Sequence, residues 1–378
     1  MLKIGFDAKR ALTNTRGLGN YSRNLIDGLI SYYPENEYFL YSKNANTGDC
    51  LVWQDSVKAN AHIVNPPSSL KLGQAYWRSF GIIKNIKTDN LDIYHGLSHE
   101  IPYQLTNRKT KYVVTIHDLI FTYFKQNFSS IDRRIYFSKI KYSCQKADQI
   151  IAISQQTKND LIDILHVPDE KVNVLYQSCS PLFYNESSEE KKNLVRLKYN
   201  LPENYLLFVG ALVGHKNIAK IIEALAYLPE NKRLPLVIVG KKTKHKEYLD
   251  SVIKKVKLSE KVKFIEYVDT IDMPSVYQMA KILVWPSLYE GFGIPIIEAL
   301  FSKLPVITSK DGCFNEAGGE NSIYVNPESA IEIADSIYNI MENNDLLSKM
   351  KQKGFEYVQK FHLEATSKQL MDFYCKII

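Results

Sequence analysis

The chain has 378 residues, of which 45% are hydrophobic, and this length exceeds what one core usually serves, so we expect two domains. Its 48 Lys and Arg outnumber its 41 Asp and Glu, which gives a formal net charge of +7. This mild excess suits an anionic small ligand or a weak contact with an acidic lipid surface. No zinc-finger spacing or arginine-rich arm supports a nucleic-acid partner.

The sequence favours a cytoplasmic protein. No uncharged apolar run approaches the ~18 residues of a membrane span. The N-terminal stretch MLKIGFDAKR enters an expected strand at once, so we expect no signal peptide. The five cysteines are scattered without a C-x-x-C pair, which indicates free thiols in a reducing compartment. Peripheral attachment to the inner face of a membrane remains an open alternative.

Short apolar runs alternate with helix-period segments along the chain, and this pattern is typical of parallel sheets covered by helices on both faces. In the first half the expected strands are KIGFD (3–7), YFLY (38–41), HIVN (62–65), DIYH (92–95), YVVTIHD (112–118) and QIIAIS (149–154). In the second half they are LLFVG (206–210), PLVIVG (235–240), VKFIEY (262–267), ILVWPS (282–287), PVITS (305–309) and SIYVN (322–326). Between them lie amphipathic segments such as 21–29 and 218–225.

Each half opens with a strand, a Gly-containing loop and an amphipathic helix, so we expect two Rossmann-like, doubly wound α/β domains. The polar stretch 184–205 carries no strand pattern and is predicted to be the linker. The domains are then residues 1–180 and about 200–360. If the carboxyl ends of both sheets face a shared cleft, ligands should bind there.

One stretch, WPSLYEGFGIPIIEAL (285–300), is specified more closely than a structural turn requires. Pro295 suits the first position of a helix, because its fixed φ fits and its missing N–H is not needed there. Gly291 and Gly293 permit a tight turn and a close approach of a ligand to the backbone. The free N–H groups and the dipole at such a helix start attract phosphate.

Two carboxylates flank this turn. Glu290 lies on the loop before the helix, and Glu298 is expected in the first helical turn. Carboxylates repel a bare phosphate, but as hydrogen-bond acceptors they suit the hydroxyl groups of a sugar. A ligand that carries phosphates between two sets of hydroxyls is a nucleotide sugar. The alternative is a helix N-terminus that merely carries favourable acidic residues.

The same stretch resembles the E-x(7)-E signature of retaining nucleotide-sugar glycosyltransferases of family 4 (group 1), which have the GT-B fold. Five further stretches resemble this family: RGLGNYSRNL (16–25), DIYHGLSHEIP (92–102), YVVTIHDL (112–119), VGALVGHKN (209–217) and LPVITS (304–309). Of these, DIYHGLSHEIP is similar to the mannosyltransferases that build bacterial surface polysaccharides. The resemblance also implies that a C-terminal helix, 364–378, packs back on the first domain, which should face the acceptor.

The resemblance implies roles for the donor-side residues. Glu298 should bind the ribose hydroxyls, and Glu290 should bind hydroxyls of the transferred sugar. Lys216 should neutralise the diphosphate and the charge that develops on the leaving group. The backbone N–H groups of three residues should lie beside Glu290: Phe292, Gly293 and Ile294. The family usually has Arg where this chain has His215, whose charge would depend on pH because an unperturbed His titrates near ~6.5.

In the first domain, the resemblance implies that Gly17 and Gly19 let a loop close against the donor or its phosphates. His117 should lie near the transferred sugar and help to orient it, whereas a His-Asp pair at a strand end is about as often structural. Asp118 either orients the imidazole or caps the next segment, and we do not expect it to be catalytic.

Metal chemistry is not expected. His95 and His99 are spaced i, i+4, but they follow a strand in HGLSHEIP, so they belong either to the acceptor side of the cleft or to a polar loop. The chain has no H-E-x-x-H and no D-x-D, the pair that holds a divalent ion in the other main glycosyltransferase fold. We expect no cofactor and no metal, with the nucleotide sugar bound as substrate.

The expected reaction is retaining transfer of a hexose, with mannose from GDP-mannose the preferred donor, to a glycan or a lipid-linked glycan. A UDP-hexose donor is the next choice, and a nucleotide-sugar epimerase on the same fold is the alternative enzyme. A dehydrogenase is disfavoured, because RGLGNYS lacks a third glycine and no acidic residue ends the second strand. A non-enzymatic sugar-binding protein is disfavoured because such proteins are usually exported.

Overall fold

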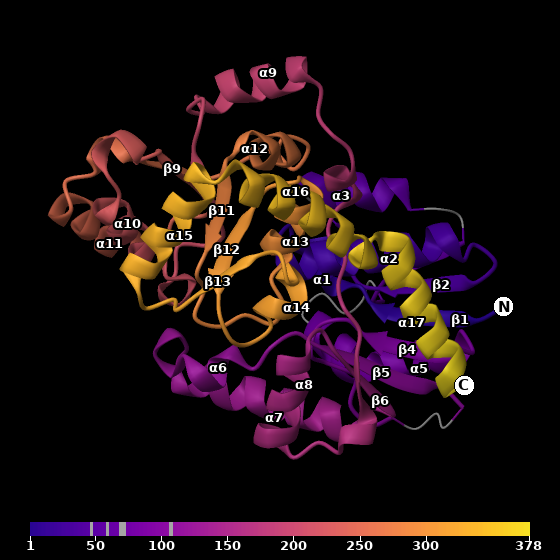
Figure 1. The fold of residues 1–378 in the computed structure, drawn as a ribbon. Coiled ribbons are helices and arrows are strands. Elements are labelled where there is room, and N and C mark those ends of the chain that lie inside the picture. Colours follow the sequence, from indigo (N-terminus) through magenta and orange to yellow (C-terminus); the bar gives the residue numbers. More distant parts are fainter. Residues whose placement is uncertain (46–47, 58–59, 68–72, 106–108) are drawn as a thin grey trace. The chain divides into compact units, whose positions relative to one another are not determined.

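A computed structural model describes residues 1–378 except 46–47, 58–59, 68–72 and 106–108. The chain divides into two compact units. The first consists of Met1–Cys179 together with Phe361–Ile378, and the second is Ser180–Lys360. Figure 1 shows a parallel sheet with helices packed around it in each unit.

The sheet of the first unit is entirely parallel, in the order β3-β2-β1-β4-β5-β6-β7. Its strands are β1 Lys3–Asp7, β2 Glu37–Tyr41, β3 Ala61–Val64, β4 Ile93–Gly96, β5 Lys111–Ile116, β6 Gln149–Ala152 and β7 Val172–Val174. The six strands expected in this half are confirmed. The sequence reasoning missed β7, because it is a three-residue edge strand with a polar residue at its centre.

Helices cover this sheet, and most of them bury apolar side chains. They are α1 Lys9–Thr13, α2 Gly17–Tyr32, α3 Gly48–Ser56, α4 Gln74–Tyr76, α5 Ile82–Thr88, α6 Ile120–Tyr123, α7 Ser130–Lys146, α8 Gln155–Leu165 and α17 Leu363–Ile377, with the π-helical turn η1 Trp77–Gly81 after α4. The predicted apolar stripe of α2 is confirmed, since Ile26 and Leu29 are fully buried.

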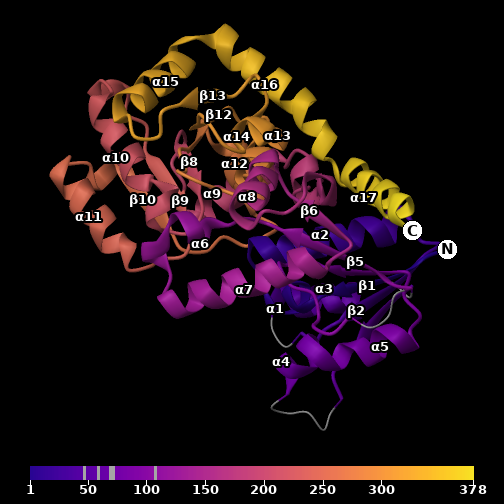
Figure 2. The ribbon, with the colours of Figure 1, turned by 90° about the horizontal axis from the view of Figure 1, so that it is seen from below.

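The C-terminal helix α17 packs against α2 (Figure 1, Figure 2). Gly28 of α2 permits this contact, since a Cβ there would lie 2.1 Å from the Ser367 hydroxyl oxygen. Tyr374 of α17 is fully buried in the core of the first unit. Residues from both ends of the chain therefore contribute to the core of the first unit.

The second unit repeats the architecture with a six-stranded parallel sheet in the order β10-β9-β8-β11-β12-β13. Its strands, all expected from the sequence, are β8 Leu206–Val209, β9 Leu236–Val239, β10 Val262–Ile265, β11 Ile282–Trp285, β12 Val306–Ser309 and β13 Ile323–Val325. Its helices are α9 Glu189–Tyr199, α10 Ile218–Tyr227, α11 His245–Lys255, α12 Met273–Met279, α13 Ile294–Phe301, α14 Phe314–Gly318, α15 Ala330–Glu342 and α16 Asn344–Val358.

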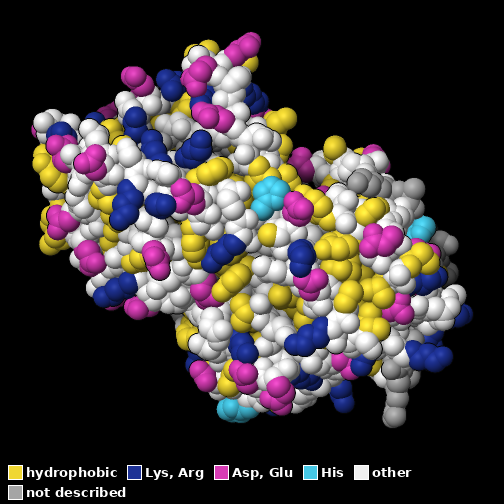
Figure 3. All heavy atoms as spheres, turned by 45° about the vertical axis from the view of Figure 1, so that its right-hand side comes forward, with side chains coloured by type: hydrophobic (Ala, Val, Ile, Leu, Met, Phe, Trp, Pro, Cys, Tyr) yellow, Lys and Arg dark blue, Asp and Glu magenta, His cyan; other side chains and the backbone are white. Residues whose placement is uncertain are grey.

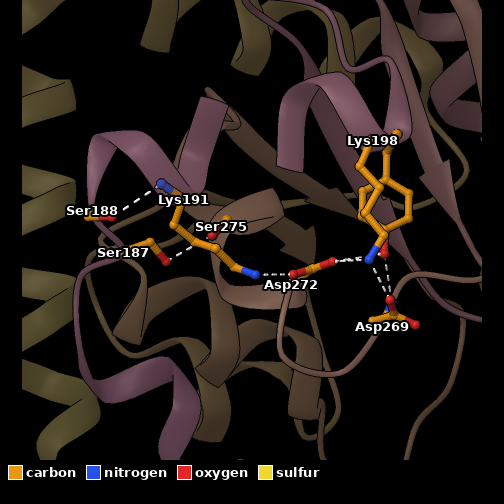
Figure 4. A network of polar contacts seen from close by, with 8 residues as sticks. Ser187, Ser188, Lys191, Lys198, Asp269, Asp272 and Ser275 are labelled. Atoms are coloured by element: carbon orange, nitrogen blue, oxygen red, sulfur yellow. Dashed lines mark hydrogen bonds and ion pairs between the residues drawn. The ribbon is translucent and has the colours of Figure 1, made fainter. Parts of the chain in front are cut away.

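The segment that we predicted as a linker lies in the second unit instead, where polar contacts anchor its helix α9 to α12. Figure 4 shows Asp272 between two lysines of α9, Lys191 and Lys198. Tyr199 also donates a hydrogen bond to Asp272 over 3.0 Å. Burial alone would raise the pKa of Asp272, but hydrogen bonds from Lys191, Lys198 and Tyr199 lower it below its usual value.

Charged side chains of both signs are interspersed on the face drawn in Figure 3. The mild positive excess of the sequence therefore does not form one large basic field on that face, as a nucleic-acid partner would favour.

Candidate active site around the start of helix α13

The E-x(7)-E stretch forms the loop between β11 and α13. Gly293 has φ = 120°, which side chains rarely adopt, so a glycine is required there. Helix α13 begins at Ile294, one residue earlier than predicted, so Pro295 is its second residue. Glu298 is therefore the fifth helical residue, beyond the first turn in which we expected it. The first N–H groups of a helix have no partner within it, and binding of an anion at this end remains a prediction.

Glu290 and Lys216 form an ion pair, which the sequence reasoning did not predict. The Lys216 Nζ lies 2.5 Å from Oε1 of Glu290, and both side chains are largely buried, with 16% and 15% exposed. The Ser287 hydroxyl donates to the same Oε1 over 2.5 Å. The Lys216 ammonium also lies 4.6 Å from the ring centroid of Trp285, a cation–π contact.

Backbone contacts join the loop that carries Lys216 to the loop that carries Glu290. The carbonyl of His215 accepts a hydrogen bond from the backbone N–H of Leu288 over 2.8 Å. Asn217 adopts the left-handed conformation, with φ = 58°, and its side-chain amide donates to the carbonyls of Pro286 and Pro327. These bonds hold the Lys216 backbone in place, so the ion pair is prearranged.

Glu298 has a separate partner. Its Oε2 accepts a 2.6 Å hydrogen bond from the hydroxyl of Tyr277, a fully buried residue of α12. Burial raises the pKa of Glu298 from 4.5 to about 7, although the Tyr277 bond partly opposes this shift. Glu298 is therefore a carboxylate whose charge changes near neutral pH. Nothing in the spacing of Tyr277 from the signature stretch indicated this contact.

Two further side chains, which the sequence reasoning missed, donate hydrogen bonds to the loop between β11 and α13. The Cys313 thiol donates to the carbonyls of Glu290 and Phe292 over 3.3 and 3.1 Å. Ser309 donates to the carbonyl of Ser287. Both lie at or just after the end of the neighbouring strand β12, so their contacts follow from the strand order β11-β12 and not from any local motif.

Gly17 and Gly19 differ in what the structure requires of them. Gly17 is the first residue of α2, and a Cβ there would meet no atom within 4 Å. A Cβ on Gly19 would lie 1.6 Å from the carbonyl oxygen of Asn14. The glycine at 19 is therefore needed for backbone packing, whereas that at 17 is not. Their contact with the donor remains a prediction.

His117 follows β5 and is buried. Its Nε2 lies 2.9 Å from the carbonyl of Leu97, and since a carbonyl only accepts, Nε2 carries the proton and Nδ1 is the acceptor. Burial and then the neighbouring His99 lower the pKa of His117 to about 3, so the ring is neutral at pH 7. Asp118 accepts a hydrogen bond from the backbone N–H of Ile120 at the start of α6, as expected for a residue that caps the next segment.

His95 is part of the core of the first unit. It lies within β4, and its Nδ1 and Nε2 are 2.6 Å from the Tyr374 hydroxyl and 2.8 Å from the Thr115 hydroxyl. The alternative that placed His95 in a polar loop is wrong, because both polar atoms are bonded inside the core. His99 does lie in a loop, at φ = 65°, with its ring 5.3 Å from that of His117.

Within the part of the chain that the structure describes, no group of three or more His, Cys, Asp or Glu residues is arranged to hold a metal ion. In the same residues, no helix has the length and apolar character needed to cross a membrane.

Comparison with known proteins places the chain in a family. Residues 16–178 match the model described as "Glycosyltransferase Family 4", and residues 189–357 match "Glycosyl transferases group 1". Together the two matches span most of the chain.

Named relatives and solved structures agree with these models. The chain is 28% identical to the O-antigen chain mannosyltransferase RfbU of Salmonella typhimurium over 77% of this chain and 74% of that protein. It is 26% identical to the O-antigen chain mannosyltransferase B of Escherichia coli, over 75% and 74%. The fold is similar to that of Alr3699/HepE from Anabaena, crystallised with UDP-glucose, with a TM-score of 0.76, 17% identity and full coverage of both chains. The chain is therefore a glycosyltransferase of family 4, in the group 1 glycosyltransferases, with the GT-B fold of two Rossmann-like domains.

Proposed function

We propose that this protein transfers a hexose, with retention of the anomeric configuration and without a metal ion, from a nucleoside diphosphate sugar to a glycan or lipid-linked glycan. The preferred donor is GDP-mannose. The observation that carries this proposal is the arrangement around the start of α13. Glu290, in the loop before this helix, is paired with Lys216 from the segment between β8 and α10, and Glu298 lies within the helix.

Each of these groups suits one part of a nucleotide sugar. Glu298, in its ionised form, accepts hydrogen bonds from the ribose hydroxyls, and Tyr277 fixes its other oxygen. Lys216 and the N–H groups of Phe292, Gly293 and Ile294 offer positive potential to the diphosphate. When the donor binds, Lys216 turns toward the phosphates and Glu290 accepts hydroxyls of the sugar. The ion pair thus keeps both groups neutralised until the ligand replaces it.

The chemistry requires no covalent sugar–enzyme intermediate. Retaining enzymes of the two-carboxylate type use one carboxylate as a nucleophile, but in the proposed complex Glu290 accepts hydroxyls of the sugar and a hydrogen bond from Ser287. In the proposed route the bond between the anomeric carbon and the phosphate oxygen breaks, and the acceptor oxygen bonds to the same face of that carbon. The acceptor proton passes to the leaving phosphate oxygen. Lys216 stabilises the negative charge that develops on this phosphate.

The choice of donor rests on the relatives. The O-antigen mannosyltransferases support mannose, whereas the fold neighbour crystallised with UDP-glucose makes a UDP-hexose the second candidate. A nucleotide-sugar epimerase remains the alternative reaction. It would convert the nucleotide sugar into its epimer without an acceptor and without net release of free nucleotide, so nucleotide release that depends on an acceptor distinguishes the transferase.

We also propose that α7 attaches the protein peripherally to an anionic lipid surface. Its first half exposes Ile131, Ile135 and Tyr136, whose exposed fractions of 69%, 46% and 45% are large for apolar side chains. The cations Arg133 and Arg134 lie on the same segment, beside the acidic Asp132, and cations next to exposed apolar side chains suit a bilayer with acidic headgroups. Ile131→Ser with Ile135→Ser should abolish co-sedimentation with phosphatidylglycerol vesicles. Equal binding of the wild type and the double variant to the vesicles would contradict this role.

The decisive test of the donor site is calorimetric titration with GDP, UDP and ADP, with and without chelator. We expect one nucleotide, GDP, to bind tightly to the wild type and weakly to Glu298→Ala, with no effect of the chelator. Glu260→Ala, which changes an exposed glutamate of the second unit, is the matched control and should bind normally. A folded wild type that binds none of the three nucleotides would refute the donor site.

The proposed role of Glu290 is tested by measuring turnover. Glu290→Gln removes the charge that pairs with Lys216 while keeping the size of the side chain, so transfer to acceptor should fall by roughly 10²-fold or more, as for loss of one stabilising group in other active sites. Nearly full turnover and donor affinity in Glu290→Gln would refute its assignment to the transferred sugar.

A further inference from the structure

A cavity of about 340 Å³ lies in the first unit at the carboxyl ends of β1, β2 and β3. It is lined by Tyr41 of β2, by residues of α1, α4 and η1, and by residues of the segments after β2 and β3. The carboxyl ends of parallel strands are where ligands bind in such sheets, and this volume falls within the range of small-molecule sites. None of the residues so far assigned to chemistry lines it.

The lining of this cavity is positively charged. Three of the residues that line it are cations, Lys9, Lys43 and Arg78, and none of the described lining residues is acidic. The Lys9 ammonium makes no hydrogen bond or ion pair with the described residues. Burial, followed by the nearby charge of Arg78, lowers the pKa of Lys9. The Lys9 side chain is exposed, and the nearby carboxylates of Glu100 and Asp7 only partly oppose the lowering of its pKa, so its ammonium is available to a bound anion.

Hydrogen bonds to two carboxylates fix the position of Arg78. Its Nε donates to Asp7 over 2.9 Å and its Nη2 donates to Glu100 over 2.6 Å. A guanidinium has five N–H donors, and the Nη1 group makes no hydrogen bond within the described part of the chain. Arg78 therefore presents an oriented donor group that a phosphate oxygen can accept.

A buried hydroxyl supplies independent evidence for a ligand. Ser42 is 4% exposed, lines the cavity, and has no hydrogen-bond partner for its Oγ. Buried polar atoms nearly always have a partner, so each exception requires an explanation. The two aromatic residues of the lining differ from Ser42, because their polar atoms have partners. Tyr41 donates to Asp89, and Trp77 donates to Asn85. Their rings therefore serve as apolar walls beside the polar groups.

We propose that this cavity binds the phosphate or diphosphate group of a phosphorylated acceptor, with Lys9 and Arg78 as its cations and Ser42 as a hydroxyl donor. This inference deepens the proposed function and rests on it in one respect, that the first unit receives the acceptor. The phosphate belongs either to a lipid diphosphate that carries the growing glycan or to a soluble sugar phosphate. Both sources present the same anionic group to the cavity.

The test is calorimetric titration of the full chain with inorganic pyrophosphate. Lys9→Gln removes the cation that lacks a partner, and Ser42→Ala removes the hydroxyl. Arg78 is left unchanged because its ion pair with the buried Asp7 supports the fold. Lys84→Gln, which changes an exposed lysine of α5 outside the cavity, is the matched control.

We expect Lys9→Gln to weaken pyrophosphate binding about tenfold, since a charge-assisted hydrogen bond is lost, and Ser42→Ala to weaken it less. Lys84→Gln should bind as the wild type does. Because Lys216 could also bind pyrophosphate, the titration is repeated in Lys216→Ala, where the cavity site should persist. Binding that survives in both Lys9→Gln and Ser42→Ala, or that vanishes in Lys216→Ala, would overturn the proposal. If Lys9→Gln fails to fold, Lys43→Gln replaces it, with the same expectation.

Two organic probes then separate the sources of phosphate. Farnesyl diphosphate should bind more tightly if the ligand is a lipid diphosphate, and mannose 6-phosphate if it is a soluble sugar phosphate, and both should depend on Lys9. If the affinity of either probe is unchanged in Lys9→Gln, the probe does not bind in this cavity as proposed. Failure of the proposed function is a different result, in which nucleotides fail to bind the second unit while pyrophosphate still binds in a Lys9-dependent manner.

Discussion

The charge of Glu298 should make nucleotide affinity depend on pH near neutrality. The perturbation is a change of pH from 8 to 6 in the wild type, compared with the same change in Glu298→Gln. Only the ionised carboxylate is a pure acceptor for ribose hydroxyls. With a pKa of about 7, Glu298 is mostly ionised at pH 8 and mostly protonated at pH 6. The ionised fraction, and with it the affinity, should fall about tenfold between these two pH values.

The assay is calorimetric titration with the nucleotide that binds most tightly, at half-unit steps of pH and constant ionic strength. The terminal phosphate of a nucleoside diphosphate also titrates, near pH ~6. Glu298→Gln supplies the correction, because it keeps the shape and one acceptor oxygen but cannot ionise. Its affinity should be lower than that of the wild type at pH 8, and its pH dependence should reflect the phosphate alone.

Protein stability provides a second readout with a defined sign. Since the folded-state pKa of Glu298 is raised from 4.5 to about 7, the folded protein binds this proton more tightly than the unfolded chain does. The free energy of unfolding should therefore decrease as pH rises from 4.5 to 7, and this contribution should be absent in Glu298→Gln. Parallel affinity profiles for wild type and Glu298→Gln between pH 6 and 8 would refute the reasoning.

Three further substitutions test contacts on which the two units depend. Tyr277→Phe removes a hydrogen bond that lowers the pKa of Glu298, so the midpoint of the nucleotide affinity profile should move to higher pH; an unchanged midpoint would contradict the contact. Gly19→Ala should destabilise the protein by about 1–3 kcal/mol through overpacking against a carbonyl oxygen, as measured by urea unfolding, whereas Gly17→Ala should change stability little. Asp272→Asn should cost about 1–2 kcal/mol because it weakens the attachment of α9. Since the pKa of Asp272 is lowered from 3.8, this difference should shrink as pH falls below that value, and a constant difference would argue against the ion pairs.

The sequence alone was sufficient for the two-domain α/β architecture, apart from strand β7 and the place of α9, and for the glycine turn at which α13 begins. Runs such as those at 206–210 and 282–287 are short, apolar and separated by helical periodicity, and these are local properties. The signature around Glu290 and Glu298 is also local, because a glycine turn followed by Pro295 specifies a helix start wherever it occurs. The family resemblance depended on the same contiguous residues.

Contacts between segments distant in the chain could not be read in this way. Lys216 and Glu290 are 74 residues apart, and they pair because β8 and β11 are neighbours in the sheet, which brings the loops at their carboxyl ends together. The same applies to Tyr277 and Glu298, which belong to different helices. No period or motif encodes such a pair.

Tertiary packing also decided the protonation states. The sequence placed His117 at a strand end but could not indicate a pKa of about 3, which arises from its burial and then from the His99 ring. Nor could it show that Lys9, Ser42 and Arg78, from three separate segments, line one cavity. Local sequence determines which elements form, because periodicity and turn chemistry act over a few residues. Burial and sheet order depend on the whole chain. They determine which charged groups come into contact and which are removed from solvent.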